Sequence, residues 1–184
     1  MRAWQTRLER RLRWPALVLT GAVFAGFLLV VLPAEAARSA EMYGAVQAPD
    51  TRWWYAPAEL SRIAEAFGPE GRAYYVRSRF TFDVVWPLAY GAFLQVAVVL
   101  AARDTVLSRL PAALVFLPTY AVLADFTENT AAAIVMHRFP ARTDPLALLA
   151  AVATPAKWAL LAASFILVAL GAFAWLFTRT RQQT

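Results

Sequence analysis

Five charged side chains lie inside or at the edge of segments that are apolar enough to cross a bilayer: Arg79, Asp83, Asp125, Glu128 and Lys157. A charge at membrane depth is costly, so it normally faces the interior of a helix bundle and has a partner. Carboxyl groups beside a lysine in such an interior can bind a polar group, fix helix packing or transfer protons. The sequence therefore predicts a polar site inside a membrane.

The third apolar segment carries Asp125, Glu128 and Asn129, at positions i, i+3 and i+4. This spacing places two carboxyls and a carboxamide on one face of a helix. Two neighbouring carboxyls in a low dielectric do not both ionise readily unless a cation is close. Lys157, on the fourth segment, is the expected cation. We predict that it lies within direct or water-bridged reach of Asp125 or Glu128.

On the second segment, Arg79, Asp83, Pro87 and Tyr90 are spaced so that they share one helical stripe. Arg79 and Asp83 can pair along the helix, and Pro87 is expected to kink it beside the acid. The stripe and the acids of the third segment predict one ligand-binding set in the outer half of the bundle. Its members are Asp83, Tyr90, Tyr120, Asp125, Glu128, Asn129 and Lys157.

Composition fixes the class of protein. Of the 184 residues, 60% are hydrophobic and only 16% are charged, which is typical of a small helical membrane protein. The absence of cysteine excludes disulfides, thiolate metal sites and cysteine nucleophiles. His137 is the only histidine and no glycine-rich phosphate loop occurs, so we predict no metal and no cofactor.

Four apolar segments predict an all-α, polytopic four-transmembrane-helix bundle that forms a single membrane domain over residues 1–184. The approximate spans are 14–32, 80–102, 110–136 and 146–177. The first could instead be a cleaved signal peptide, because small residues follow it at 33–37.

The connection 34–78 is the one sizeable segment predicted to lie outside the membrane. It contains Leu60, Ile63, Ala64 and Phe67 at the spacing of a short amphipathic helix, which Gly68-Pro69 should end. The preceding Trp53-Trp54-Tyr55 cluster is typical of a membrane interface.

Arginine placement predicts the orientation. Arginines precede the first span, flank the connection between the second and third spans, and follow the last span. With four crossings these three segments lie on one side, which the positive-inside rule assigns to the cytoplasm. The net charge of +6 is therefore explained by topology and does not require nucleic acid. We predict a multi-pass protein of the bacterial inner membrane with both termini cytoplasmic.

Three parts of the chain resemble a group of small, uncharacterised bacterial four-helix membrane proteins. They are residues 49–72, Asp83-x-x-x-Pro87-x-x-Tyr90 and Asp125-x-x-Glu128-Asn129. This resemblance implies the fold and no activity. A weaker similarity, to the emopamil-binding, sigma-2-receptor-like superfamily, is carried by Asp83, Pro87, Tyr90 and Phe93 and by residues 154–158. It implies carboxylates facing a lipophilic pocket, but the histidine placement of sterol-isomerising members is missing.

These features predict binding of a membrane lipid or another lipophilic or amphiphilic small molecule in a polar pocket. A structural or assembly subunit, with a membrane-protein partner or a second copy of the chain, is the first alternative. A membrane enzyme acting by carboxyl acid–base chemistry, such as an isomerase, and a channel for ions or protons are the others. An empty volume beside the acids would favour a ligand, and a carboxyl without a cation would favour an enzyme.

Overall fold

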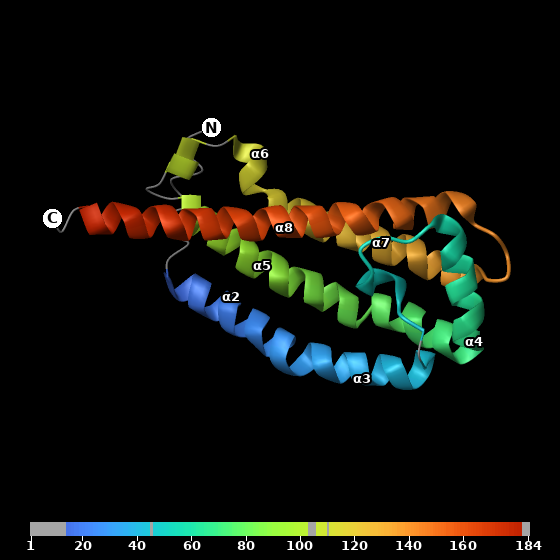
Figure 1. Cartoon of the computed structure of the whole chain (residues 1–184). Coiled ribbons are helices and arrows are strands. Elements are labelled where there is room, and N and C mark those ends of the chain that lie inside the picture. Colours follow the sequence, from blue (N-terminus) through green and yellow to red (C-terminus); the bar gives the residue numbers. More distant parts are fainter. Residues whose placement is uncertain (1–13, 45, 103–105, 110, 182–184) are drawn as a thin grey trace.

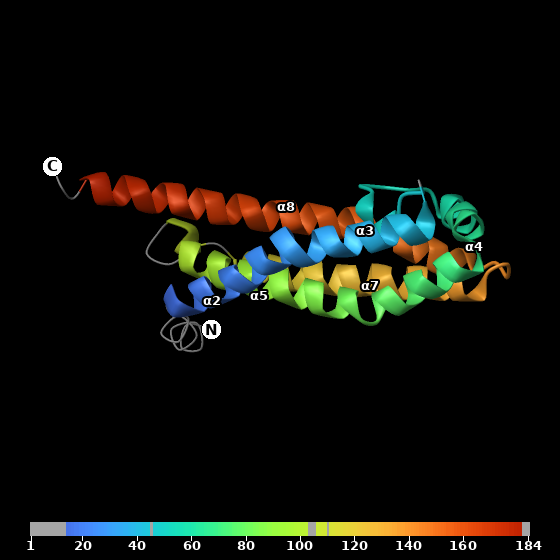
Figure 2. The same ribbon diagram turned by 90° about the horizontal axis from the view of Figure 1, so that it is seen from below.

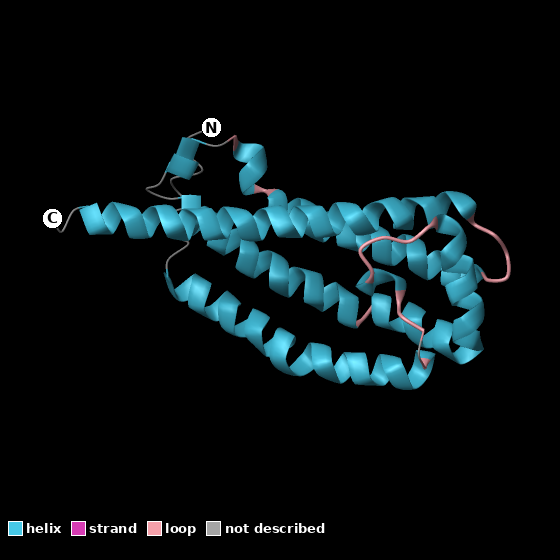
Figure 3. Cartoon of the chain, in the orientation of Figure 1, coloured by secondary structure: helices cyan, strands magenta, loops and turns pink. Residues whose placement is uncertain are grey.

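The computed structural model describes residues 14–44, 46–102, 106–109 and 111–181, and within these residues every regular element is a helix (Figure 3). The predicted all-α class is confirmed. The first element is one continuous helical rod made of α2 (Trp14–Gly26), the π-helical turn η1 (Phe27–Val31) and α3 (Leu32–Tyr43).

The connection after α3 contains the short turn η2 (Pro49–Thr51) and leads into α4 (Pro57–Arg79). The Glu59 carboxylate accepts a hydrogen bond from the backbone N–H of Ala56 at 2.7 Å, which caps the start of α4. Gly68 interrupts the helix with a φ of 63°, a conformation that favours glycine. The residues before it form the predicted amphipathic helix, and its four apolar positions are buried.

A turn at Phe80–Thr81 separates α4 from α5 (Phe82–Ala102). The chain then forms η3 (Val106–Arg109) and α6 (Ala112–Val115). The last two helices are α7 (Leu117–Arg138) and α8 (Asp144–Arg181).

The rod α2–α3 and the helices α5, α7 and α8 run lengthwise in one bundle, as Figures 1 and 2 show. α7 packs along α8, and α4 closes one end of the bundle against both. The main apolar core lies at this α4 end and includes Tyr75, Leu60, Met136 and Ala150. α2 begins and α8 ends at the opposite end.

Two glycines permit close approach between helices. A Cβ on Gly171 of α8 would lie 2.6 Å from the backbone oxygen of Ala101 in α5. A Cβ on Gly91 of α5 would lie 2.5 Å from a methyl of Val122 in α7. Small residues at such positions are the usual means of packing helices in a membrane, where water does not drive them together.

The structure moves the predicted boundaries of the first half of the chain. The first helix does not stop at residue 32 but continues to Tyr43, because the π-helical turn just before Pro33 accommodates the proline. Residues 57–79 are helical as well, so the predicted connection 34–78 shrinks to residues 44–56. A turn at Phe80–Thr81 separates the second part of α4 from α5, whereas α5 continues through Pro87.

Three stretches are long and apolar enough to cross a membrane: Trp14–Tyr43, Pro57–Ala102 and Asp144–Leu176. Apolar side chains of α2 and α8 remain exposed over much of their length, which suits a lipid environment. The chain therefore has the features of a membrane protein. The arginines before residue 14 and Arg103, on which the predicted orientation depends, lie outside the described residues, as does residue 110 at the start of the predicted third span.

Candidate functional site

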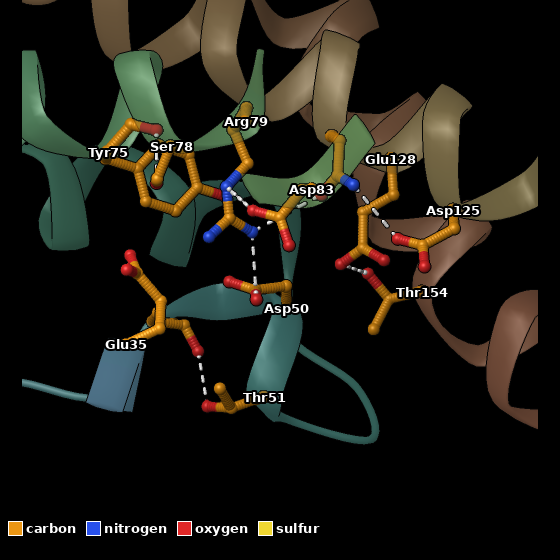
Figure 4. Close-up of polar contacts among 12 residues, drawn as sticks. Glu35, Asp50, Thr51, Tyr75, Ser78, Arg79, Asp83, Asp125, Glu128 and Thr154 are labelled. Atoms are coloured by element: carbon orange, nitrogen blue, oxygen red, sulfur yellow. Dashed lines mark hydrogen bonds and ion pairs between the residues drawn. The ribbon is translucent and has the colours of Figure 1, made fainter. Parts of the chain in front are cut away.

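Arg79, the last residue of α4, is the centre of a buried ionic cluster (Figure 4). Its Nε lies 2.8 Å from Oδ2 of Asp83 in α5, and its Nη1 lies 2.8 Å from Oδ2 of Asp50 in η2. The guanidinium also lies 4.4 Å from the centre of the Tyr75 ring. A planar guanidinium can hold two carboxylates in different directions and pack on a ring at once. Arg79 thus joins α4, α5 and the connection 44–56.

Lys157 of α8 is the centre of a second cluster. Its Nζ lies 2.6 Å from Oε2 of Glu128 and 3.6 Å from Oδ1 of Asp125, both on α7. The predicted pairing of Lys157 with these acids is confirmed. The other oxygen of Glu128 accepts a hydrogen bond of 2.6 Å from the Thr154 hydroxyl. All four side chains are buried, so the contacts connect α7 to α8 in a region of low dielectric.

Asn129 connects the two clusters. Its Oδ1 accepts a hydrogen bond of 3.3 Å from Arg79, and its Nδ2 donates one of 3.0 Å to Asp125. Tyr90 donates a further hydrogen bond of 2.8 Å to the other oxygen of Asp125. The two clusters are therefore one network, in which Arg79 and Lys157 face four acids: Asp50, Asp83, Asp125 and Glu128.

The structure brings together six of the seven predicted site residues, and Tyr120 is the exception. Its side chain is 43% exposed, and among the described residues it makes no hydrogen bond to the network. Tyr120 precedes Asp125 by five residues, which rotates it by about 140° around α7 relative to the acid. The neighbouring Thr119 instead donates a hydrogen bond of 2.9 Å to Gln95 of α5, away from the clusters.

The sequence prediction missed one member of the network, Asp50, and three tyrosines beside it: Tyr43, Tyr55 and Tyr75. Asp50 lies in the connection, where no helical period assigns it to a face. The tyrosines come from α3, the connection and α4, all of which were predicted to lie outside the membrane. The proline before Asp50 marked a turn, but it did not indicate what the turn packs against.

Asp50 is held in place by its charge. Burial favours the neutral acid, but the positive charges of Arg79 and Lys157 outweigh it and hold the pKa of Asp50 below its usual range. A carboxyl with a lowered pKa in the folded state stabilises that state above its unfolded pKa. This contribution of Asp50 is lost as the pH falls through its folded pKa. The connection should therefore remain attached to Arg79 at neutral pH.

The connection is also attached to α8. The indole N–H of Trp158 donates a hydrogen bond of 3.0 Å to the backbone oxygen of Arg52. The ring of Trp158 lies 5.3 Å from that of Trp53, which is itself 71% exposed. Tyr55, two residues later, is fully buried beside Thr154. Burial, followed by the nearby carboxylates of Glu128 and Asp50, raises the pKa of Tyr55, so its hydroxyl stays protonated.

Four buried oxygen atoms near Arg79 and Thr154 lack a well-formed hydrogen bond to any residue that the structure describes, although the hydroxyls of Tyr43 and Tyr55 lie beside Ser78 and Thr154, whose oxygens can accept from them. They are the hydroxyls of Tyr43, Tyr55 and Tyr75 and Oδ1 of Asp50, and we call this set the hydroxyl cluster. The ring centroids of Tyr43 and Tyr75 lie 6.4 Å apart. The Tyr75 ring packs against the guanidinium of Arg79, which also binds Asp50. Buried polar atoms without partners are rare in folded proteins and call for an explanation.

Within the described part of the chain, no group of three or more His, Cys, Asp or Glu side chains is placed to hold a metal ion. No protein-family model, curated protein or solved structure matches the chain. The resemblances drawn from sequence motifs therefore stay predictions, and function must be argued from the geometry of the site.

Proposed function

We propose that this chain is a four-span protein of the bacterial inner membrane that binds an amphiphilic small molecule, with the polar head near Arg79 at the α4 end of the bundle. The observation that carries the proposal is the hydroxyl cluster, in which Tyr75 and Asp50 each have a buried oxygen without a partner among the described residues, and the hydroxyls of Tyr43 and Tyr55 have only Ser78 and Thr154 beside them. A polar head group would supply those hydrogen bonds, and the adjoining lipid would accommodate an apolar tail.

The fourth span in this proposal is α7. Its 22 residues give a helix about 33 Å long, which matches the hydrocarbon core of a bilayer. Asp125, Glu128 and Asn129 lower its mean hydropathy, but all three are buried against other helices. Leu123, on another side of α7, is 56% exposed and would face lipid. Polar residues that face a bundle interior are compatible with a membrane span.

The proposed orientation can be tested with a reporter enzyme that is active only outside the cytoplasm. Fused after Thr184, it should give no activity, because the arginine-rich ends are expected to stay inside. Fused to a chain truncated after Ala56, it should be active, because the connection 44–56 follows one crossing. Activity of the first fusion, with none from the second, would reverse the orientation.

The ionic network and the hydroxyl cluster have different parts in this proposal. The charged groups bind one another, so they fix the positions of α4, α5, α7 and α8. The hydroxyl cluster retains hydrogen-bonding capacity that the described residues do not use. We therefore assign support to the network, and binding to Tyr43, Tyr55, Tyr75 and Asp50.

A structural or assembly subunit is the second candidate, and one observation favours it. Each of the four acids lies within 4 Å of a cation: Asp50 and Asp83 are paired with Arg79, and Asp125 and Glu128 with Lys157. Such pairing is what a network needs if its purpose is to fix helix positions. The same pairing gives no support to carboxyl acid–base catalysis, which requires an acid free to exchange its proton.

A tyrosine substitution distinguishes binding from a purely structural role. Tyr75→Phe removes one unpartnered hydroxyl and keeps the ring under Arg79. If the hydroxyl contacts a ligand, retention of the co-purifying molecule should fall about tenfold, the upper range for one hydrogen bond. Native mass spectrometry from mild detergent measures the retained mass, and the thermal unfolding midpoint should stay the same or rise.

Tyr120→Phe is the matched control, because Tyr120 lies apart from the network and is 43% exposed. It should leave both retention and the midpoint unchanged. A wild-type protein that retains no small molecule, or a Tyr75→Phe variant that retains as much as wild type, would favour the structural subunit.

A further inference from the structure

The hydroxyl cluster contains two kinds of oxygen atom. Each tyrosine hydroxyl can donate one hydrogen bond and accept others, whereas an ionised carboxylate oxygen can only accept. Asp50 uses Oδ2 to bind Arg79 and leaves Oδ1 without a described partner. A complementary ligand must therefore donate at least one hydrogen bond to Asp50. It must also accept a hydrogen bond from the hydroxyl of Tyr75, and it can accept from those of Tyr43 and Tyr55 in place of Ser78 and Thr154.

Three common classes of head group meet these requirements differently. A carboxylate or phosphate offers acceptors but, when fully ionised, no donor for Asp50. An alkylammonium offers donors but no acceptor, so the tyrosine protons would stay unpaired. A hydroxyl offers both. A head group with two or more hydroxyls can therefore satisfy Asp50 and the tyrosines together.

The charges of the network also disfavour an anionic head group. Arg79 and Lys157 are each paired with two of the four acids, so neither cation is left for a further anion. An incoming anion would have to compete with Asp50 or Asp83 for Arg79. An uncharged head group adds no charge to this buried region and so avoids the cost of desolvating one.

We infer that the ligand is an amphiphile with an uncharged head group bearing several hydroxyls, of the glycerol or sugar type, which binds between Asp50 and the tyrosines of the hydroxyl cluster. The inference rests on the proposed function, that the chain binds an amphiphile near Arg79. It adds the chemical class of the head group and assigns Asp50 as the residue that accepts its hydrogen bond.

Asp50 is also the member of the cluster closest to the surface. Its side chain is 19% exposed, whereas Tyr55 and Tyr75 are fully buried. In Figure 4, Asp50 lies on the connection side of Arg79, facing the same guanidinium that packs on Tyr75. A head group arriving from the side of the connection would contact Asp50 first and then the hydroxyls of Tyr55 and Tyr75.

The test compares three amphiphiles with the same acyl chain length, namely a monoacylglycerol, an alkylammonium and a fatty-acid anion at alkaline pH. Each is titrated into the purified full chain in lipid nanodiscs, and binding is followed by tryptophan fluorescence and by the shift in unfolding midpoint. The monoacylglycerol should bind at least about tenfold more tightly than either charged probe, which corresponds to the loss of one or more hydrogen bonds.

Two variants test whether the tighter binding of the monoacylglycerol depends on the hydroxyl cluster. Tyr55→Phe and Tyr75→Phe should each weaken binding of the monoacylglycerol about fivefold to tenfold and leave binding of the alkylammonium, which accepts no hydrogen bond, unchanged. Tyr120→Phe should change none of the affinities. Because both variants retain their rings, a preserved unfolding midpoint shows that the loss concerns binding and not folding.

The outcomes separate the inference from the proposed function. Tightest binding of the fatty-acid anion or of the alkylammonium would overturn the inference and leave amphiphile binding in place. If no probe binds, the hydroxyls are satisfied by water alone, and both the inference and the proposed function are wrong. A monoacylglycerol preference that survives both tyrosine substitutions would place the head group elsewhere and overturn the inference.

Discussion

Replacing Lys157 by methionine should lower the free energy of unfolding by about 3–5 kcal/mol, the cost of breaking a buried ion pair from one side. Methionine keeps the length of the side chain but leaves Glu128 and Asp125 without their cation, although Glu128 is fully buried. One of these acids must then bind a proton or remain as an uncompensated charge. Thermal or denaturant unfolding of the purified protein in mild detergent measures the loss.

A second substitution should restore part of this stability. In the double variant Lys157→Met with Glu128→Gln, the neutral amide can still accept the hydrogen bond from Thr154, and the charge of the fully buried Glu128 is removed. Arg142→Met is the control, because its ion pair with Asp144 is largely exposed and should contribute little. Equal stability of Lys157→Met and this control would show that the Lys157 cluster does not hold α7 to α8.

Arg79→Gln should be comparably destabilising, by about 3–5 kcal/mol, because it removes the cation that Asp50 and Asp83 share. It should also release the connection 44–56, since Asp50 is one of the attachments of that segment to the bundle. Limited proteolysis should then cut this connection faster than in wild type. Unfolding in detergent, measured on the same sample, separates local release from global loss.

The conservative variant tests why arginine occupies this position. A lysine ammonium is a point charge and cannot hold Asp50 and Asp83 in two directions while packing flat on the Tyr75 ring. Arg79→Lys should therefore recover part of the stability lost in Arg79→Gln. The connection 44–56 should still be cut faster than in wild type. If Arg79→Lys matched wild type in both stability and proteolysis rate, the positive charge alone, without the planar guanidinium, would be sufficient to fix the connection.

Helical periodicity was sufficient to predict much of the ionic network. Asp125, Glu128 and Asn129 share a face because residues three and four apart always lie together on a helix. Their need for a cation in a low dielectric predicted Lys157, although it is far away in sequence. The confirmed contacts of 2.6 and 3.6 Å follow from these two rules.

Two details of the structure differ from what the sequence indicated. Tyr120 was included in the predicted site, yet the rotation of α7 places it on an exposed face. The first span was predicted from its apolar run to cover residues 14–32. A π-helical turn ahead of Pro33 lets the helix continue to Tyr43, and single-residue propensities do not predict such a turn.

The sequence alone therefore determined which helices carry charge, which face each charge occupies and that the environment is apolar enough to force pairing. Only the tertiary structure decided that Asp50 binds Arg79, and that Tyr43, Tyr55 and Tyr75 gather around that pair. Tyr43 and Tyr75 lie on helices, and only the packing of α3 against α4 brings them together. For Asp50 and Tyr55 the physical reason is the difference between repeating and non-repeating backbone. A helix fixes the direction of each side chain by its repeat, whereas a side chain in a connection is directed by what the chain packs against.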